Sequence, residues 1–272
     1  MPLRLEAPAK LNLSLRVVGR REDGHHLLES ELVLLELADR LLLLPGCAGL
    51  RLEGEGAADL PLDATNLASR GLAAGLDGEP ELACLALEKR IPAAAGLGGG
   101  SSDAAAAWRL GRAWRGVPDG AKPADLAALA AIGADVPFFA AQHAAARVSG
   151  IGEQVAPVAA AERHVVLLHP PFGLSTAEVF AALRPEEWGQ RSNDLLGPAL
   201  RLRPEIDELF ALVVTAGGDP RLTGSGPTVF AFADDAAHAR AMASRLERPG
   251  LRVSTTRTRT AAASIEPINE EE

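Results

Sequence analysis

The segment Pro92-Ala-Ala-Ala-Gly-Leu-Gly-Gly-Gly-Ser-Ser-Asp103 is the part of this sequence that decides its interpretation. It follows a strand-like stretch, Glu81–Ile91, and precedes an alanine-rich run, Ala104–Trp114, that favours a helix. Glycines let a backbone approach an anion closely and turn its amides inward. A helix that starts directly afterwards adds unpaired N–H groups and the positive end of its dipole. The segment is therefore predicted to hold phosphate groups, with Ser101 or Ser102 capping the helix.

Two common phosphate-binding motifs do not fit this segment. A Walker A loop needs a lysine directly before its serine or threonine, and Gly100 stands before Ser101. A dinucleotide-binding fingerprint needs a glycine where Ser101 stands, and no clear acidic partner follows on a next strand. The simplest alternative is a flexible turn between strand and helix. Four glycines within Gly96–Gly100, followed by two serines, favour the phosphate site over that alternative.

Strand patterns dominate the first part of the chain, and helix and strand patterns alternate in the rest. Alternating apolar residues predict strands at Leu3–Ala7, Leu11–Val18, Leu27–Leu35, Leu41–Leu44 and Leu50–Glu53. Helices are predicted at Asn66–Ala74, Ala124–Ala131, Ala177–Leu183, Glu205–Val214 and Ala236–Arg245. Later strands are predicted at His164–His169, Thr228–Phe232 and Leu251–Thr256, and the tail Ile265–Glu272 is predicted to be disordered.

The hydrophobic pattern resets around Gly150–Val158, where polarity also rises, and this indicates a domain boundary. A chain of 272 residues is long enough for two domains. We therefore predict an N-terminal domain over residues 1–155, containing the glycine-rich segment, and a C-terminal domain over residues 156–272.

Composition and charge restrict the class of protein. The chain carries 27 basic and 36 acidic side chains, a formal net charge of −9, which argues against a nucleic-acid partner. A hydrophobic content of 47% supplies a core, so the chain is not expected to be disordered. No signal-peptide core is visible at the N-terminus, and the longest apolar stretch, Leu32–Leu44, is too short and too charged to span a membrane.

The cysteine count agrees with this class. Cys47 and Cys84 are too few for a disulfide framework or for a four-ligand zinc site. A cytoplasmic globular protein with no membrane partner is therefore expected.

Lysine is rare in this chain, which makes each lysine a candidate for a specific role. Of the 27 basic residues only Lys10, Lys89 and Lys122 are lysines, and arginine cannot replace a lysine where a compact point charge is needed. Lys10 opens a predicted strand, and Asp135 follows a predicted helix. By position alone they could equally be an exposed strand lysine and a turn aspartate. Phosphoryl transfer needs positioning, charge neutralisation and a base near the acceptor hydroxyl, which one aspartate, one lysine and a glycine cradle could supply.

Four parts of the sequence, in order, resemble the GHMP small-molecule kinases. The glycine-rich segment is similar to the central motif of that family, and Leu222-Thr-Gly-Ser-Gly-Pro-Thr-Val-Phe230 is similar to its C-terminal glycine motif. Two further parts resemble the members of the family that act on a cytidine-diphospho-methylerythritol alcohol. They are Ala7-Pro-Ala-Lys-Leu-Asn-Leu13 with Gly19-Arg-Arg-Glu-Asp-Gly-His-His-Leu27, and Ile132-Gly-Ala-Asp-Val-Pro-Phe-Phe139. The resemblance implies an α+β fold of two domains. The first has a mixed β-sheet and helices, and the second is an α/β sandwich with an antiparallel sheet.

The resemblance also implies an activity and a set of site residues. The activity is ATP-dependent phosphorylation of the 2-hydroxyl of the cytidine-diphospho-methylerythritol substrate, in the non-mevalonate route to isoprenoids. Asp135 corresponds to the general base, and Lys10 to the partner that keeps it ionised and orients the hydroxyl. The residues implied for ATP are Asn66, Pro92, Gly96, Leu97, Gly98, Gly99, Gly100, Ser101 and Ser102, and those implied for the substrate are Asn12, His25, His26, Thr176 and Phe180. Mg²⁺ accompanies ATP, and no ligand residues are assigned to it.

The chain departs from the family pattern among the substrate-binding residues. His25 stands where the family usually has a tyrosine that stacks on cytosine, and this chain has no tyrosine. We predict that His25 stacks on the base opposite Phe180; the alternative is an exposed loop histidine that merely precedes His26. Elsewhere, residues that differ from the usual pattern are Ala94, Gln142 and Leu196.

Three other functions remain open from the sequence. A GHMP kinase for mevalonate, homoserine or a sugar is disfavoured by Asp23-Gly24-His25-His26, which the resemblance ties to cytidine recognition. A nucleotide-binding regulator without catalysis would be expected to have lost Lys10 or Asp135, and both are present. An NAD(P)-binding module conflicts with the glycine pattern. The expected state is a monomer or homodimer.

Overall fold

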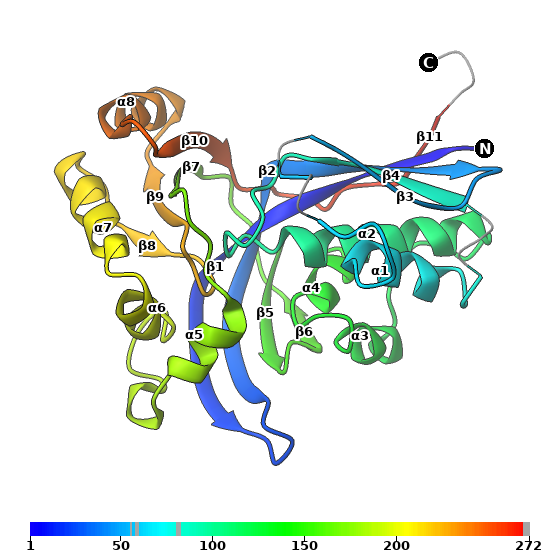
Figure 1. Ribbon diagram of the computed structural model, residues 1–272, viewed down its shortest axis with the longest axis horizontal. Coiled ribbons are helices and arrows are strands. Elements are labelled where there is room, and N and C mark those ends of the chain that lie inside the picture. The colour runs from blue at the N-terminus through cyan, green and yellow to red at the C-terminus, as the bar shows by residue number, and fades with distance from the viewer. Residues whose placement is uncertain (55, 58–59, 80–82, 269–272) are drawn as a thin grey trace.

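The computed structural model describes residues 1–54, 56–57, 60–79 and 83–268, and within them the strands form two sheets (Figure 1). In the larger sheet the order is β11-β1-β2-β4-β3, with β5 paired to β2 and β6 to β5. Its strands are β1 (Leu3–Arg20), β2 (His26–Pro45), β3 (Gly49–Gly54), β4 (Ala83–Lys89), β5 (Ala145–Gly150), β6 (Gln154–Pro157) and β11 (Glu266–Pro267). The smaller sheet has the order β10-β7-β9-β8, built from β7 (His164–His169), β8 (Arg221–Leu222), β9 (Val229–Ala233) and β10 (Arg252–Arg257).

Strand pairing agrees with the fold expected from the sequence. In the larger sheet β3 and β4 are parallel and the other described pairs are antiparallel, so the sheet is mixed. The described pairs of the smaller sheet are all antiparallel. These features confirm the predicted α+β fold. β6 extends across position 155/156 and pairs with β5, and the domain boundary placed there stays a prediction.

β1 and β2 are each one long strand, where the sequence pattern predicts two. The predicted breaks at residues 8–10 and 36–40 are wrong, because β1 and β2 stay paired past Pro8 with a shift of register between Pro8 and Lys10. Such a bulge accommodates a proline, which has no N–H to give to the ladder. As a result β1 runs on into the second half of the molecule. There Leu15 and Val17 are buried among side chains of the C-terminal half.

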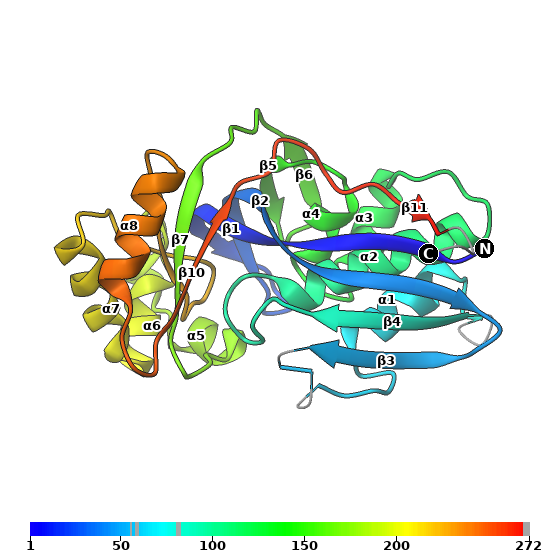
Figure 2. The ribbon, with the colours of Figure 1, turned by 90° about the horizontal axis from the view of Figure 1, so that it is seen from above.

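Helices cover one face of the larger sheet and flank the smaller one (Figures 1 and 2). They are α1 (Leu67–Gly75), α2 (Gly99–Trp114), α3 (Pro123–Leu129), α4 (Val136–Ala140), α5 (Thr176–Ala182), α6 (Leu196–Leu202), α7 (Glu205–Thr215) and α8 (Ala236–Leu246), with a 3-10 turn at Pro185–Glu187. α1 and α2 are in close contact: a Cβ on Gly71 would lie 2.0 Å from the carbonyl oxygen of Ala104. None of the helices in the described ranges is long and apolar enough to cross a bilayer.

α2 begins earlier than the serine cap predicted from the sequence. Gly98 precedes its first residue in the left-handed conformation, with φ of 72°, and no side chain caps the helix. The backbone N of Ser102 donates to the carbonyl oxygen of Gly98 at 2.9 Å. Because glycine adopts a positive φ at little cost, the chain turns directly from the glycine-rich segment into the helix. The prediction of Ser101 or Ser102 as cap is therefore wrong, and both serines lie within the first turn.

The ends of the described chain lie side by side. Glu266 and Pro267 form β11 against Arg4 and Leu3, so the prediction of a disordered tail is wrong for these two residues. The backbone N of Ile268 also donates to the carbonyl oxygen of Pro2, at 3.0 Å. The open edge of β1 supplies these partners, and the polar composition of the tail gives no sign of it. Residues 81–82 of the predicted strand and residues 269–272 of the tail lie outside the described residues.

The two cysteines form a disulfide bond. Cys47, in the turn after β2, is joined to Cys84 in β4, and their Cα atoms are 5.1 Å apart. A single cross-link of this kind is compatible with the absence of a disulfide framework.

Candidate active site

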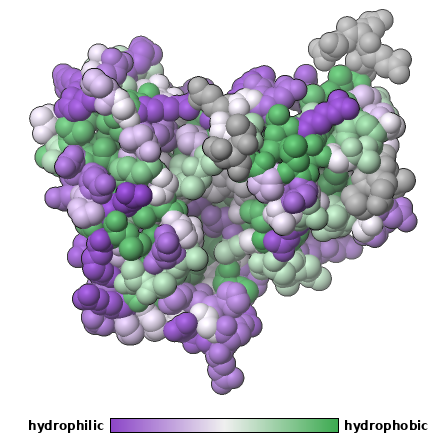
Figure 3. All heavy atoms as spheres, in the orientation of Figure 1, coloured by the Kyte–Doolittle hydropathy of each residue, from purple (hydrophilic) through white to green (hydrophobic). Residues whose placement is uncertain are grey.

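A cleft of about 530 Å³ lies where the two halves of the molecule meet, and the surface is visibly hollowed between the two lobes (Figure 3). This volume is typical of small-molecule sites. Its walls include β1, the glycine-rich segment, the residue before α4, α5 and the loop before β9. The predicted site residues that line it are Lys10, Asn12, Asn66, Pro92, Gly96, Leu97, Gly98, Gly99, Gly100, Ser101, Asp135, Thr176 and Phe180. Three predicted residues, His25, His26 and Ser102, are not among the described residues that line it.

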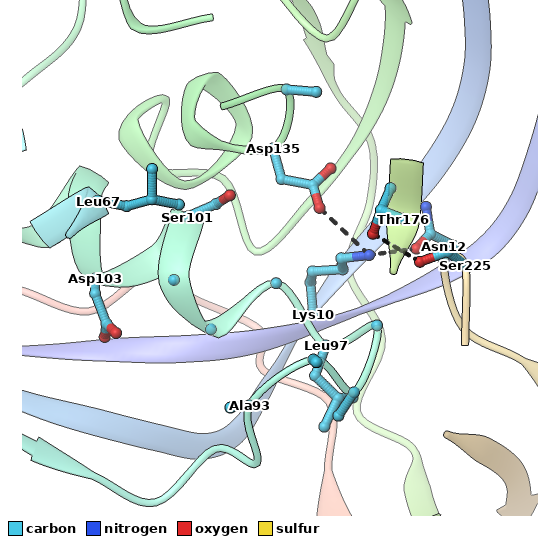
Figure 4. A pocket seen from close by; sticks show the side chains of 18 of the residues that line it. Lys10, Asn12, Leu67, Ala93, Leu97, Ser101, Asp103, Asp135, Thr176 and Ser225 are labelled. Atoms are coloured by element: carbon cyan, nitrogen blue, oxygen red, sulfur yellow. Dashed lines mark hydrogen bonds and ion pairs between the residues drawn. The ribbon is translucent and has the colours of Figure 1, made fainter. Parts of the chain in front are cut away.

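Lys10 and Asp135 face each other across the cleft. The Nζ atom of Lys10 lies 3.4 Å from Oδ2 of Asp135, and their side chains are 4% and 33% exposed. Asp135 immediately precedes α4, yet its carboxylate makes no capping hydrogen bond to that helix. It points toward Lys10 instead (Figure 4). The arrangement leaves one carboxylate open to the cleft with a buried ammonium beside it.

Hydrogen bonds from both halves of the chain hold the lysine in place. Nζ of Lys10 donates to Oδ1 of Asn12 at 2.5 Å, and Nδ2 of Asn12 donates to Oγ of Ser30 at 2.8 Å. The backbone N of Asn12 donates to Oγ1 of Thr223 at 3.2 Å. The backbone N of Lys10 donates to the carbonyl oxygen of Leu97 at 2.9 Å, which ties β1 to the glycine-rich segment. Both polar ends of Asn12 are therefore engaged, and its amide orients the ammonium.

The two glycine motifs of the sequence meet backbone to backbone. A Cβ on Gly96, whose φ is +74°, would lie 2.4 Å from the carbonyl oxygen of Thr223 and 2.8 Å from that of Gly226. Nearby, the hydroxyls of Thr176 and Ser225 are hydrogen-bonded at 2.9 Å (Figure 4). The second motif therefore buttresses the first, and it places α5 at the edge of the cleft.

Gly98 allows a test of this packing. A Cβ there would be strained by the φ of +72° and would lie 3.0 Å from both Cε and Cγ of Lys10. If this segment holds ATP, as the family resemblance implies, Gly98→Ala is expected to lower kcat/KM for ATP by about tenfold or more, because it displaces Lys10 as well as the backbone. The matched control is Gly116→Ala, since Gly116 has a φ of +73° and nothing within 4 Å of the added atom. Steady-state kinetics and Tm are measured for both variants. Equal loss of activity in the two would show that backbone strain alone is responsible.

Asn66 has a local structural use. Its Oδ1 accepts from the backbone N of Ala68 as the N-cap of α1, and its Nδ2 donates to the carbonyl oxygen of Pro61 at 2.8 Å. Its side chain therefore braces the loop that forms one wall of the cleft. Ser102 is 1% exposed and lies buried in the first turn of α2, which explains why it does not reach the cleft.

The two adjacent histidines have different environments. The ring of His26 stacks on Phe180 with centroids 5.1 Å apart, and the edge of Trp188 packs against it. Burial, with Arg20 nearby, lowers the pKa of His26 below its ordinary value. His25 is 64% exposed and pairs with Asp23 at 3.2 Å. The structure thus places His26, rather than His25, against Phe180.

Several residues of the cleft had no assigned role in the sequence analysis. Ser30 and Ser225 line it, and so do Lys89 and Asp103, which lie under the glycine-rich segment. For Lys89 the scarcity of lysine was a usable signal. Ser225 belongs to the C-terminal glycine motif, which could have suggested it, whereas no pattern in the sequence marks Ser30, because only the folded chain brings β2 to the cleft.

Comparison with known proteins places this chain in one family, with matches in both halves of the chain. The GHMP kinases N terminal domain matches residues 58–143, and the GHMP kinases C terminal region matches residues 177–250. A 4-diphosphocytidyl-2-C-methyl-D-erythritol kinase of Paracoccus denitrificans is 40% identical over an alignment of 270 positions, which covers 90% of this chain and 93% of that protein. An enzyme of that name from Methylorubrum extorquens is 42% identical over an alignment of 291 positions, gaps included, which covers 94% of this chain and 98% of that protein.

Solved structures also match this chain. A crystal structure of 4-(cytidine 5'-diphospho)-2C-methyl-D-erythritol kinase superposes with a TM-score of 0.75 at 35% identity, covering 94% of this chain and 98% of that one. A homoserine kinase from Cytophaga hutchinsonii superposes with a TM-score of 0.68 at 16% identity, covering 97% of each chain, and that likeness concerns the fold alone.

Proposed function

The chain belongs to the 4-diphosphocytidyl-2-C-methyl-D-erythritol kinases of the GHMP family, and on this premise we propose that it phosphorylates the 2-hydroxyl of that alcohol with ATP, giving the 2-phosphate and ADP. The observation that carries the proposal for the site is the pair of Lys10 and Asp135. The pair lies 3.4 Å apart in the cleft, next to the glycine-rich segment. A base beside a phosphate cradle is the arrangement that phosphoryl transfer to an alcohol requires.

In this mechanism Asp135 accepts the proton of the 2-hydroxyl as its oxygen attacks the γ-phosphorus of ATP. The bond from that phosphorus to the bridging oxygen breaks, and ADP leaves with the bond's electron pair. The ammonium of Lys10, held by Asn12, orients the carboxylate and offsets negative charge near the acceptor oxygen.

The glycine-rich segment is proposed to hold the ATP phosphates. Its backbone lies at the first turn of α2, a helix of 16 residues whose N-terminus has no side-chain cap. Unpaired N–H groups at such an end favour phosphate oxygens. Pro92, Leu97 and Ser101 also line the cleft, and Asn66, which lines it too, donates to the carbonyl oxygen of Pro61. Mg²⁺ enters with ATP as part of that substrate, and we assign it no protein ligands.

A coupled assay of ADP formation tests the activity. With ATP and Mg²⁺, the diphosphocytidyl alcohol is expected to support turnover, and mevalonate and homoserine are expected to give only the background rate. Comparable turnover with mevalonate or homoserine would contradict the proposed substrate. The cytoplasmic location and the monomeric or homodimeric state stay predictions from the sequence.

The cytidine end is proposed to bind at Phe180, Thr176 and the two histidines. Stacking of a base on an aromatic ring is worth about 1–3 kcal/mol. We expect Phe180→Ala to raise the Kd of the diphosphocytidyl alcohol by about tenfold or more and to leave the Kd of an ATP analogue unchanged. Phe210→Ala, a partly buried phenylalanine of α7 outside the cleft, is the control. Equal Kd values for Phe180→Ala and wild type would remove Phe180 from the site.

The stacking of His25 on cytosine stays a prediction, and His26, which stacks on Phe180 in the structure, is the alternative residue for this role. If His25 turns from the surface to stack on the base, His25→Ala weakens binding of the alcohol about fivefold, and His25→Tyr binds at least as tightly as wild type. Calorimetry on both variants and on His26→Ala distinguishes the two residues. Weakening in His26→Ala alone would assign the stacking to His26.

A further inference from the structure

Three ionisable side chains are buried together beneath residues 92–98 of the glycine-rich segment. Lys89 is the last residue of β4, Asp39 lies in β2 and Asp103 in α2, and their side chains are 4%, 0% and 4% exposed. Nζ of Lys89 donates to Oδ2 of Asp39 and, at 2.6 Å, to Oδ2 of Asp103. This triad of Asp39, Lys89 and Asp103 lies apart from the Lys10–Asp135 pair, and the mechanism makes no use of it.

The triad holds both ends of the glycine-rich segment. At the strand end, Oδ1 of Asp39 accepts from the backbone N of Arg90 at 2.5 Å and from that of Ile91 at 2.8 Å. At the helix end, Asp103 belongs to the beginning of α2, soon after the turn at Gly98. Lys89 links Asp39 to Asp103, so one ammonium holds both the strand end before the loop of residues 92–98 and the helix that follows it.

The cleft comes close to this lysine. Lys89 and Asp103 both line it, and a Cβ on Gly99 would lie 3.5 Å from Nζ of Lys89. A buried ion pair is poor evidence for stability, since removing two charges from water costs about as much as their attraction returns. A buried ion pair does fix the relative positions of the elements that carry it, because each buried charge requires its partner.

The two carboxylates are not equivalent. Asp39 accepts three hydrogen bonds, whereas Oδ1 of Asp103 is buried with no hydrogen-bond partner among the described residues. Burial, assisted by the neighbouring Asp39 and opposed by Lys89, raises the pKa of Asp103 to about 8. Asp103 therefore holds its proton to a higher pH in the folded chain than in the unfolded chain. Asp39 is therefore the main partner of the Lys89 ammonium.

We infer that Lys89 and Asp39 are positioning residues that fix the glycine-rich segment for ATP, with Asp103 in a secondary role. The inference rests on the proposed function, because it assigns the segment to ATP. It predicts that breaking the Lys89–Asp39 pair impairs nucleotide binding, and that binding of the diphosphocytidyl alcohol is spared.

The test is calorimetry with a non-hydrolysable ATP analogue and with the diphosphocytidyl alcohol, together with Tm. Lys89→Met is expected to raise the Kd of the analogue by about tenfold or more and that of the alcohol by less than about twofold. Asp103→Asn is expected to raise the Kd of the analogue by less than about threefold, since it replaces a neutral carboxyl group by a neutral amide. Lys89→Met binding the analogue as tightly as wild type would overturn the inference. So would an Asp103→Asn effect as large as that of Lys89→Met.

Two further variants separate positioning from stability. Arg109→Met breaks another ion pair of α2, in which the buried Arg109 contacts the partly exposed Asp119 at 2.7 Å away from the cleft, and it should lower Tm without changing the Kd of the analogue. The double replacement Lys89→Met with Asp39→Asn leaves no unpaired buried charge. Its Tm should recover toward wild type while the Kd of the analogue stays raised. Recovery of both would reduce the triad to a stabilising role and overturn the inference.

Asp103 supplies an independent readout in pH. The folded chain holds a proton on Asp103 that the unfolded chain releases above the ordinary value of 3.8, with Lys89 and Asp39 as the charged groups facing it. Wild-type stability relative to Asp103→Asn should therefore fall as the pH rises from 5 to 8. Parallel Tm curves for the two would overturn the assignment of a neutral Asp103. Wild type that binds no ATP analogue would contradict the proposed function and the inference together, whereas analogue binding with an unaffected Lys89→Met contradicts the inference alone.

Discussion

Asp135→Asn is expected to lower kcat by about 10²–10⁴-fold and to leave KM for ATP and for the alcohol nearly unchanged. The amide matches the carboxylate in size and can keep a contact with Lys10, but it cannot accept the hydroxyl proton. Since the side chain of Asp135 makes no capping bond, the replacement should not disturb α4. The loss should therefore fall on the chemical step. Single-turnover kinetics with saturating ATP measure that step directly.

A matched control removes an aspartate of the same kind from the surface. Asp219 pairs with Arg221 at 3.0 Å and lies outside the cleft, so Asp219→Asn should retain wild-type kcat. Near-normal turnover in Asp135→Asn would exclude the general-base role. A raised KM at unchanged kcat would make Asp135 a binding residue only.

Lys10→Arg is expected to lower kcat/KM by about 10²-fold or more although the charge is kept. Lys10 runs between two glycine motifs that leave little room. A Cβ on Gly98 would lie 3.0 Å from its Cε, and one on Gly224 would lie 3.1 Å from its Nζ. A planar guanidinium is wider than the ammonium and cannot occupy that space without moving one of the glycine motifs. It would also separate Asp135 from its partner.

Lys122 provides the comparison for this variant. It is exposed at the start of α3, so Lys122→Arg should leave kcat/KM and Tm at wild-type values. Steady-state kinetics on both variants decide the matter. If Lys10→Arg retains most of its activity, a compact point charge is not what the site needs from Lys10.

The parts of the site that sequence reasoning could predict are those whose chemistry is local. The glycine-rich segment follows one strand and starts one helix, so its composition is enough to predict a phosphate site. The convergence of Lys10 and Asp135 is different. Their residue types allow it, but only the family resemblance suggested it, because contacts between β1 and the start of α4 depend on the packing of α2 between them.

The elements that the sequence pattern predicted wrongly or did not predict have physical causes that hydrophobic periodicity does not reveal. The sequence pattern ends the first strand before Pro8, whereas in the structure a shift of register lets pairing continue past a residue that lacks a donor. β6 and β8 have four and two residues, too few for a period to be visible. Asp39 looks in the sequence like an interruption of an apolar run, yet it is fully buried because Lys89 and two backbone N–H groups satisfy it.

The pairing of β11 with the start of β1 makes the described chain almost a closed ring. Because the backbone of Ile268 bonds that of Pro2, a linker of a few residues would join the two ends without crossing the molecule. New termini could then be opened at an exposed turn. Such circular permutants would keep the proposed catalytic groups, Lys10 in β1 and Asp135 directly before α4, on intact elements, and they would change the order in which the strands emerge during synthesis.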